Sequence, residues 1–269
     1  MATNNTPDGM MKHIKRKTVM HMEITKENFH KMKPQKASKD LLNNLEFNFV
    51  KGKQAFLVME NGDILGSFFY NDNGKACAIP LANPVLIYFN LAQSHLRDIV
   101  DARKSLLGLF RDKKTDVNED SLRLFYQYFG LTSTFVVMLM TAVEAFVNQK
   151  IDQDFKYEKP DQNKCMRVFD YEQIQRWIPL NEKIESILNK IFSKNFAKAY
   201  PLKQQHFNNL KELRDLIVHT KAEKHFESYI EVYRKTLKFN FNETIEAMKD
   251  FINYYEMNLI EPCPCSQQI

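Results

Sequence analysis

Apolar and polar positions alternate along residues 45–80 with the period of half-buried β-strands. Four short apolar runs are separated by polar or turn-forming residues: 45–49, 55–59, 64–70 and 76–79. Asn61-Gly62 lies between two of these runs. An Asn-Gly pair in such a place is a strong hairpin signal, because both turn residues take positive φ. The pattern predicts a small antiparallel meander of three or four strands.

From Pro84 onward the apolar period changes to that of amphipathic helices. We expect helices over residues 84–110, 121–155, 180–192, 202–219 and 240–259. Pro160, Pro179 and Pro201 mark breaks, because proline cannot continue a helix that it did not start. Short connections favour antiparallel neighbours. The expected fold class is therefore mainly α, an antiparallel helical bundle preceded by the small antiparallel β-meander.

Glycine is scarce, and this excludes a large β fold. The chain of 269 residues has seven glycines, and none follows Gly130. A β-sandwich needs positive-φ turns, which glycine supplies most easily. The four cysteines are too few for a disulfide framework in a chain of this size.

Residues 124–143 form an uncharged run long enough to span a bilayer. Its helical pattern continues into Glu144 and Asn148, which is typical of the core helix of a water-soluble protein. The N-terminal residues also lack the apolar segment of a signal peptide. We expect a cytoplasmic protein that makes no membrane contact.

Positive charge is concentrated at the N-terminus. Residues 1–39 contain nine Lys or Arg and three acidic residues, a net charge of +6. Such an arm suits a polyanionic partner such as nucleic acid, and it equally suits a solvated terminus. The expected organisation is a basic, partly flexible segment at 1–39, the meander at 40–80, the bundle at 81–260 and a flexible cysteine-containing tail at 261–269.

Most catalytic signatures are absent from the sequence. It has no phosphate-binding loop, dinucleotide fingerprint, nucleophile elbow or His-Glu-x-x-His motif. Carboxylate-bridged di-iron bundles need paired Glu-x-x-His motifs, and the chain has none. We therefore expect neither a metal nor a cofactor.

The segment from Leu210 to His219 combines an apolar face with a chemically unusual polar face. At about 100° per residue, one side of this helix is formed by Leu210, Leu213, Leu216 and Ile217. The other side carries Lys211, Arg214, Asp215 and His219, with the apolar Val218 among them. A histidine that follows an acid by four residues, beside two cations, is a candidate catalytic cluster.

The order Arg214-Asp215-Leu216-Ile217-Val218-His219 resembles the mark of the HEPN superfamily (higher eukaryotes and prokaryotes nucleotide-binding). That mark is an Arg, four to six residues and a His, with Asn or Asp frequently following the Arg. Residues 141–148 look like the earlier core helix of the same family. The resemblance covers roughly residues 81–260. Arg16 and His21 have the same spacing but lack the acid.

The resemblance implies a metal-independent endoribonuclease of a toxin or of phage or stress defence. His219 would carry protons, Arg214 would bind the phosphate and Asp215 would hold the imidazole tautomer. Lys211 and Lys221 would contact the RNA backbone. Glu144 would brace Arg214 across the bundle.

One chain offers a single such histidine, and the family forms composite sites by dimerising. Val218 within the polar face suits a symmetric interface. The implied partners are RNA, a second copy of the chain and an antitoxin or defence protein.

Two simpler interpretations stay open. The chain could be a catalytically silent HEPN domain that binds nucleotide or RNA or serves as a protein-interaction module. Arg214 and Asp215 could equally form a surface ion pair, with His219 favoured by the dipole at the end of its helix.

Overall fold

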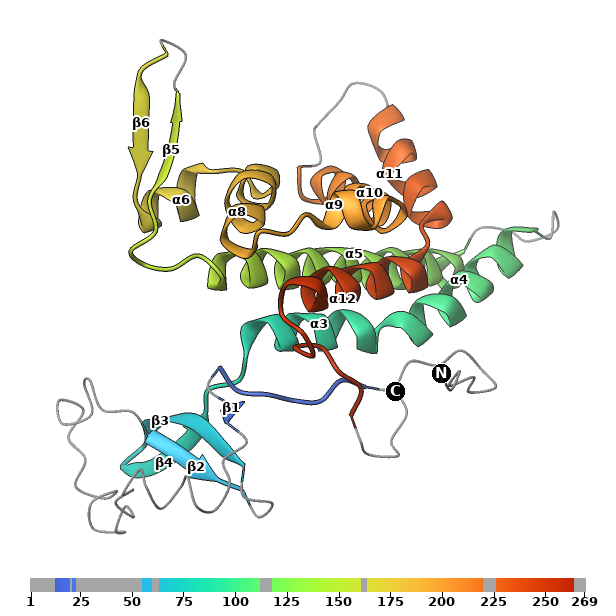
Figure 1. Cartoon of the computed structure of the whole chain (residues 1–269). Helices are drawn as coiled ribbons and strands as arrows, with labels where there is room; N and C mark the ends of the chain where they lie inside the picture. The colour runs from blue at the N-terminus through green and yellow to red at the C-terminus, as the bar shows by residue number, and fades with distance from the viewer. Residues whose placement is uncertain are drawn as a thin grey trace, which may run out of the picture. The chain divides into compact units, whose positions relative to one another are not determined.

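The computed structural model describes residues 13–19, 21–22, 55–59, 63–111, 118–160, 164–219 and 226–263. The chain divides into two compact units, Lys15–Leu86 and Met1–Ile14 together with Ile87–Ile269. The division follows residue 86, whereas the sequence pattern places it after residue 80. The described residues confirm a mainly helical protein with a small antiparallel sheet before the helices (Figure 1).

The sheet is built around its longest strand, β3 (Ile64–Asp72). β3 pairs antiparallel with β2 (Ala55–Val58) and with β4 (Lys75–Pro80). The turn into β4 is Asn73-Gly74, and both residues have positive φ, 50° and 87°. Asparagine and glycine tolerate this left-handed region better than other residues, which explains the tight hairpin.

A further strand comes from the segment expected to be a basic arm. β1 (His21–Met22) pairs antiparallel with the start of β3. The preceding Thr18 forms a bridge with Ala82, so part of this segment runs along the sheet unit. A two-residue strand carries no periodicity, so the sequence could not indicate it. The expected strand at 45–49 and the Asn61-Gly62 turn lie outside the described residues.

A long helix, α5 (Glu119–Gln149), organises the helical unit. It contacts the other long helices of this unit, as Figure 1 shows: α4 (Leu96–Arg111), α10 (Pro201–Val218), α11 (Glu227–Lys238) and α12 (Phe241–Tyr255). At its N-terminus the Asn118 side chain accepts a hydrogen bond from the Ser121 backbone N–H, and Ser121 Oγ accepts one from the Asn118 N–H. This capping box satisfies donors that a helix start otherwise leaves unpaired.

The interior face of α5 is completely buried and rich in aromatic contacts. Phe146 has no exposed surface and packs edge-on against Phe251 of α12. Tyr128 is also fully buried, and its hydroxyl donates to the Thr236 carbonyl oxygen of α11. Burial raises the pKa of the Tyr128 hydroxyl to about 12, so this donor keeps its proton.

By length and composition α5 could cross a membrane, and within the described ranges no other helix meets this test. Half of its most apolar stretch is buried inside the chain.

Three helix limits differ from the sequence pattern, and one of them is the end of α12, at Tyr255 and not near residue 259. The expected helix at 84–110 is broken at His95 into α3 (Pro84–Ser94) and α4. Ser94 Oγ donates to the Leu91 carbonyl oxygen there and competes with the helical backbone. α5 ends at Gln149 and not near residue 155, because Ile151 turns into a separate apolar cluster.

Short elements connect α5 with α10, and several of them were not expected. They are β5 (Tyr157–Pro160), β6 (Met166–Phe169), α6 (Tyr171–Trp177), α7 (Leu180–Glu182), the π-helix η2 (Lys183–Leu188), α8 (Asn189–Phe192) and α9 (Phe196–Ala199). The expected helix at 180–192 is therefore present, but its middle is a π-helix. Ile151 joins these elements through a cluster that includes Phe169, Ile174 and Ile187.

Phe146→Ala tests how strongly the fold depends on the buried face of α5. Removing a fully buried phenylalanine typically lowers the free energy of unfolding by ~3–5 kcal/mol. Tyr126→Ala is the control on the same helix, because Tyr126 is 75% exposed, and we expect it to cost below about 0.5 kcal/mol. Urea unfolding followed by circular dichroism measures both, and equal losses would contradict the assignment of the core.

Candidate functional site

α10 presents the candidate cluster at the edge of its buried face. Phe207, Leu210 and Leu213 are buried, and the helix packs against α5 and α12. Helical periodicity then leaves Lys211, Arg214 and Asp215 partly exposed at the rim of the bundle. Pro201 begins the helix, a position where its missing N–H costs nothing.

Arg214 lies between two carboxylates. Its Nη2 atom forms an ion pair with Oε1 of Glu144 on α5, and its Nη1 atom donates to Oδ1 of Asp215 at 2.8 Å. The side chain of Arg214 is 25% exposed, so this contact is shielded more than an ordinary surface pair. Lys211 Nζ donates to the other oxygen of Asp215 at 2.9 Å. The structure thus brings Glu144, Lys211, Arg214 and Asp215 together.

A second cation approaches Glu144 from η2, and the sequence reasoning missed it. Lys183 is only 5% exposed, and its Nζ donates to Asn148 Oδ1 and to the Gln175 carbonyl oxygen, both at 3.0 Å. Burial lowers the pKa of the Lys183 ammonium, and the negative charge of Glu144 partly offsets this. Lys183 lies four residues before Ile187 on an apolar face, and this signal could have identified it.

The cluster has an excess of positive charge. Arg214, Lys211 and Lys183 are opposed by the carboxylates of Glu144 and Asp215, which leaves a net charge of +1. Charge-assisted hydrogen bonds to a phosphate are strong, and a guanidinium can bind two of its oxygens. The net charge therefore favours an anion near Arg214, although the carboxylates of Glu144 and Asp215 occupy both of its Nη atoms in this structure.

His219 stands apart from this cluster. It caps the end of α10, where its backbone N–H donates to the Asp215 carbonyl oxygen at 3.0 Å. Its side chain is exposed and makes no hydrogen bond or ion pair with any described residue. The Asp215 carboxylate is directed to Arg214 and Lys211, and not to the imidazole. Lys221, the other expected backbone contact, lies outside the described residues.

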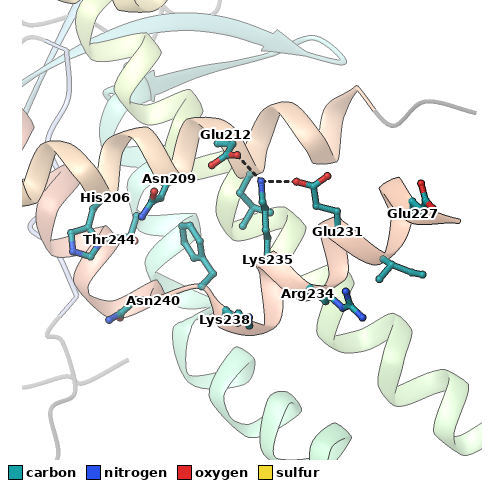
Figure 2. Close-up of a pocket in the computed structure, with 13 residues that line it drawn as sticks. His206, Asn209, Glu212, Glu227, Glu231, Arg234, Lys235, Lys238, Asn240 and Thr244 are labelled. Carbon is teal, nitrogen blue, oxygen red and sulfur yellow. Dashed lines mark hydrogen bonds and ion pairs between the residues drawn. The ribbon is translucent and has the colours of Figure 1, made fainter. Parts of the chain in front are cut away.

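A cavity of about 530 Å³ opens on the opposite flank of α10, between this helix, α11 and α12. Figure 2 shows Lys235 held between Glu212 and Glu231, at 2.5 and 2.8 Å. These hydrogen bonds raise the pKa of Lys235, and its positive charge is paired with two carboxylates. His206 contacts Thr244 at the other end of the cavity, with 3.3 Å between Nδ1 and Oγ1. Three Lys or Arg side chains and three Glu side chains line this cavity, so its formal charges balance.

In the described ranges no group of three or more His, Cys, Asp or Glu side chains is arranged to hold a metal ion. Comparisons with protein-family models, with curated proteins and with solved structures find no match for this chain. The chemistry of the Arg214 cluster is therefore the basis for assigning a function to this chain.

Glu144→Gln tests whether this carboxylate compensates the two cations. The substitution keeps the size of the side chain but removes its negative charge. The buried Lys183 then loses the nearby charge of Glu144, and Asp215 is the carboxylate that still pairs with Arg214. We expect the free energy of unfolding to fall by about 1–3 kcal/mol, as for other hydrogen bonds between charged groups.

Glu212→Gln is the matched control, because Glu212 pairs with Lys235 at the surface of α10 and is 60% exposed. Exposed pairs contribute below about 1 kcal/mol. Denaturant unfolding of both variants gives the comparison, and a loss in Glu144→Gln no larger than in the control would contradict the role of Glu144.

Proposed function

We propose that the protein is a metal-independent endoribonuclease of the HEPN type. One observation carries the proposal. Arg214, which pairs with Glu144 of α5, lies on α10, and the same helix ends at the exposed His219. An anion-binding guanidinium and an exposed imidazole on one helix are the two groups that cleavage by the RNA's own hydroxyl requires.

The reaction transfers two protons and breaks one bond. An imidazole takes the proton of the ribose 2′-hydroxyl, and the oxygen attacks the neighbouring phosphorus. The bond from phosphorus to the 5′-oxygen breaks, and that oxygen receives a proton from a second, protonated imidazole. The products are a 2′,3′-cyclic phosphate and a 5′-hydroxyl. Arg214 stabilises the charge that develops on the phosphoryl oxygens.

Both proton transfers need a histidine, so we place His219 from each of two protomers in a composite site. Val218 precedes His219 and is 50% exposed at the end of α10. An apolar side chain beside the charged cluster suits a two-fold interface between the ends of two α10 helices. Asp215 would turn to the imidazole, and Lys211 to the RNA backbone, once the strand binds. Lys221 would be a further backbone contact.

The second candidate is a catalytically silent HEPN domain. Such a domain would bind RNA or nucleotide, or serve as a protein-interaction module. It is favoured by Asp215, whose carboxylate is occupied by Arg214 and Lys211 and leaves the imidazole without an orienting partner. Both candidates place the chain in the cytoplasm. An antitoxin or defence partner belongs to the nuclease alone.

His219→Ala and Arg214→Ala test the chemistry. The parent should cut single-stranded RNA in EDTA and leave 2′,3′-cyclic phosphate ends, which mass spectrometry of the products identifies. His219→Ala removes the proton carrier and should lower the cleavage rate by ~10²–10⁴-fold. Arg214→Ala should have a comparable effect, because the developing charge loses its main donor.

His21→Ala is the control, because Arg16 and His21 have the same spacing outside the cluster. Its cleavage rate should equal that of the parent. A parent that binds RNA in a shift assay but does not cut it would support the silent domain. A requirement for a divalent metal, or an unchanged rate in His219→Ala, would refute the nuclease mechanism.

Val218→Glu tests the composite site. A charge at this exposed position should separate the protomers, and the cleavage rate should fall as far as in His219→Ala. Sedimentation velocity should show the change from dimer to monomer. Leu202→Glu is the control, because Leu202 is 83% exposed near the other end of α10; it should leave the dimer intact. A parent that is monomeric while it cleaves would contradict the proposal.

A further inference from the structure

A second cavity, of about 440 Å³, lies between α10 and the α7–η2–α8–α9 segment, beside Tyr255 of α12, and neutral amides are the largest group in its lining. Five of its eleven lining residues are Asn or Gln: Asn181, Asn189, Asn195, Gln204 and Asn208. The charged lining residues are Glu185 and Lys198, which balance. The buried ring of Phe207 supplies an apolar wall.

We propose that this amide pocket binds one nucleobase of the RNA strand, next to the phosphate held at Arg214. The proposal rests on the proposed function and adds to it a determinant of sequence preference. It follows from the position of the pocket on the flank of α10 that carries Lys211 and Asp215, and from the chemistry of its amides.

The pocket and the Arg214 cluster share one flank of α10. At about 100° per residue, Gln204, Asn208 and Lys211 lie within about 60° of one another around the helix axis. The midpoint of Gln204 and Asn208 is seven positions before the midpoint of Lys211 and Asp215, which at 1.5 Å per residue is about 10 Å along the helix. An unstacked single strand with its bases splayed out can reach both places.

The opposite wall of the pocket is formed by α7, η2 and α8, and this segment is also connected to the cluster. At one end, Asn189 of α8 accepts a hydrogen bond from the Tyr255 hydroxyl at 2.6 Å. Toward the other end, Asn181 lies two residues before Lys183, whose ammonium is joined to α5 through Asn148. Glu144 then acts electrostatically on Lys183 and pairs with Arg214. The segment that forms this wall is thus linked to Glu144 through Lys183, which lies outside the lining of the pocket.

Hydrogen bonds within the protein occupy only some of the donor and acceptor atoms of the amides that line the pocket. Gln204 Nε2 donates to Asn208 Oδ1 at 3.0 Å, which leaves Gln204 Oε1 and the Asn208 amide nitrogen available. An acceptor beside a donor matches the edge of adenine, which Asn and Gln bind in pairs of hydrogen bonds through N6 and N7. A phosphodiester has no donor for these acceptors, and the balanced charges of Glu185 and Lys198 give it no net attraction.

Asn208→Ala and Asn209→Ala form a matched pair of variants. Asn209 accepts from Gln205 Nε2 at 2.9 Å, which repeats the Gln204–Asn208 pair on the next residues, but it lies outside the amide pocket. We would sequence the cleavage products of a mixed-sequence RNA made by the parent and by each variant. The parent should cut at a fixed offset from adenine, with a preference of about 5- to 100-fold over the other bases.

Asn208→Ala should reduce this preference to near unity, whereas Asn209→Ala should retain it. A parent that cuts without base preference, or a preference that survives in Asn208→Ala, would overturn the base pocket while the nuclease stands.

A binding measurement separates the two hypotheses. Fluorescence anisotropy with the His219→Ala protein would compare a short labelled RNA containing one adenine with the same RNA carrying an abasic site. Tighter binding of the adenine-containing RNA that is lost in His219→Ala/Asn208→Ala supports the pocket even if the parent proves to cut no RNA. Equal binding of the two RNAs would overturn the pocket.

Discussion

The carboxylate of Glu144 must compensate two cations that the fold withdraws from water. Arg214 arrives from α10 and Lys183 from η2, and Glu144 lies on α5 between them. A buried ammonium is costly without hydrogen bonds and a nearby negative charge. Asn148, one turn further along α5, supplies one hydrogen bond to Lys183. The docking of α10 and of η2 on α5 thus depends on a pair of polar residues near the C-terminal end of α5.

This arrangement gives α10 two different flanks. On one flank Lys211, Arg214 and Asp215 form a cluster with excess positive charge beside the amide-lined cavity. On the other flank, in the cavity of about 530 Å³, Lys235 is paired with Glu212 and Glu231, and the acidic side chains in the lining equal the Lys and Arg side chains in number. An anion gains more from a cluster with a net positive charge than from one whose charges balance. The physical contrast between the flanks is the reason for assigning the RNA to the first.

Much of the architecture could be predicted because helices and hairpins have local periodicity. The Asn73-Gly74 turn and the buried faces of α5, α10 and α12 follow from side-chain types and spacing. Helix limits were less accurate. The break at His95 depends on a serine that competes for a carbonyl oxygen, and the end of α5 depends on packing of Ile151.

The sequence by itself determined that Arg214, Asp215 and His219 follow one another on an amphipathic helix, because the rise and twist of a helix are set by its backbone. It also indicated Glu144 as a partner for Arg214, but the contact joins residues 70 positions apart and exists only through the docking of α10 on α5. The contact of Lys183 with Asn148, the direction of Asp215 away from His219 and the amide-lined cavity were decided by tertiary structure alone. Each depends on which side chains from distant segments meet, and helical periodicity carries no information about that.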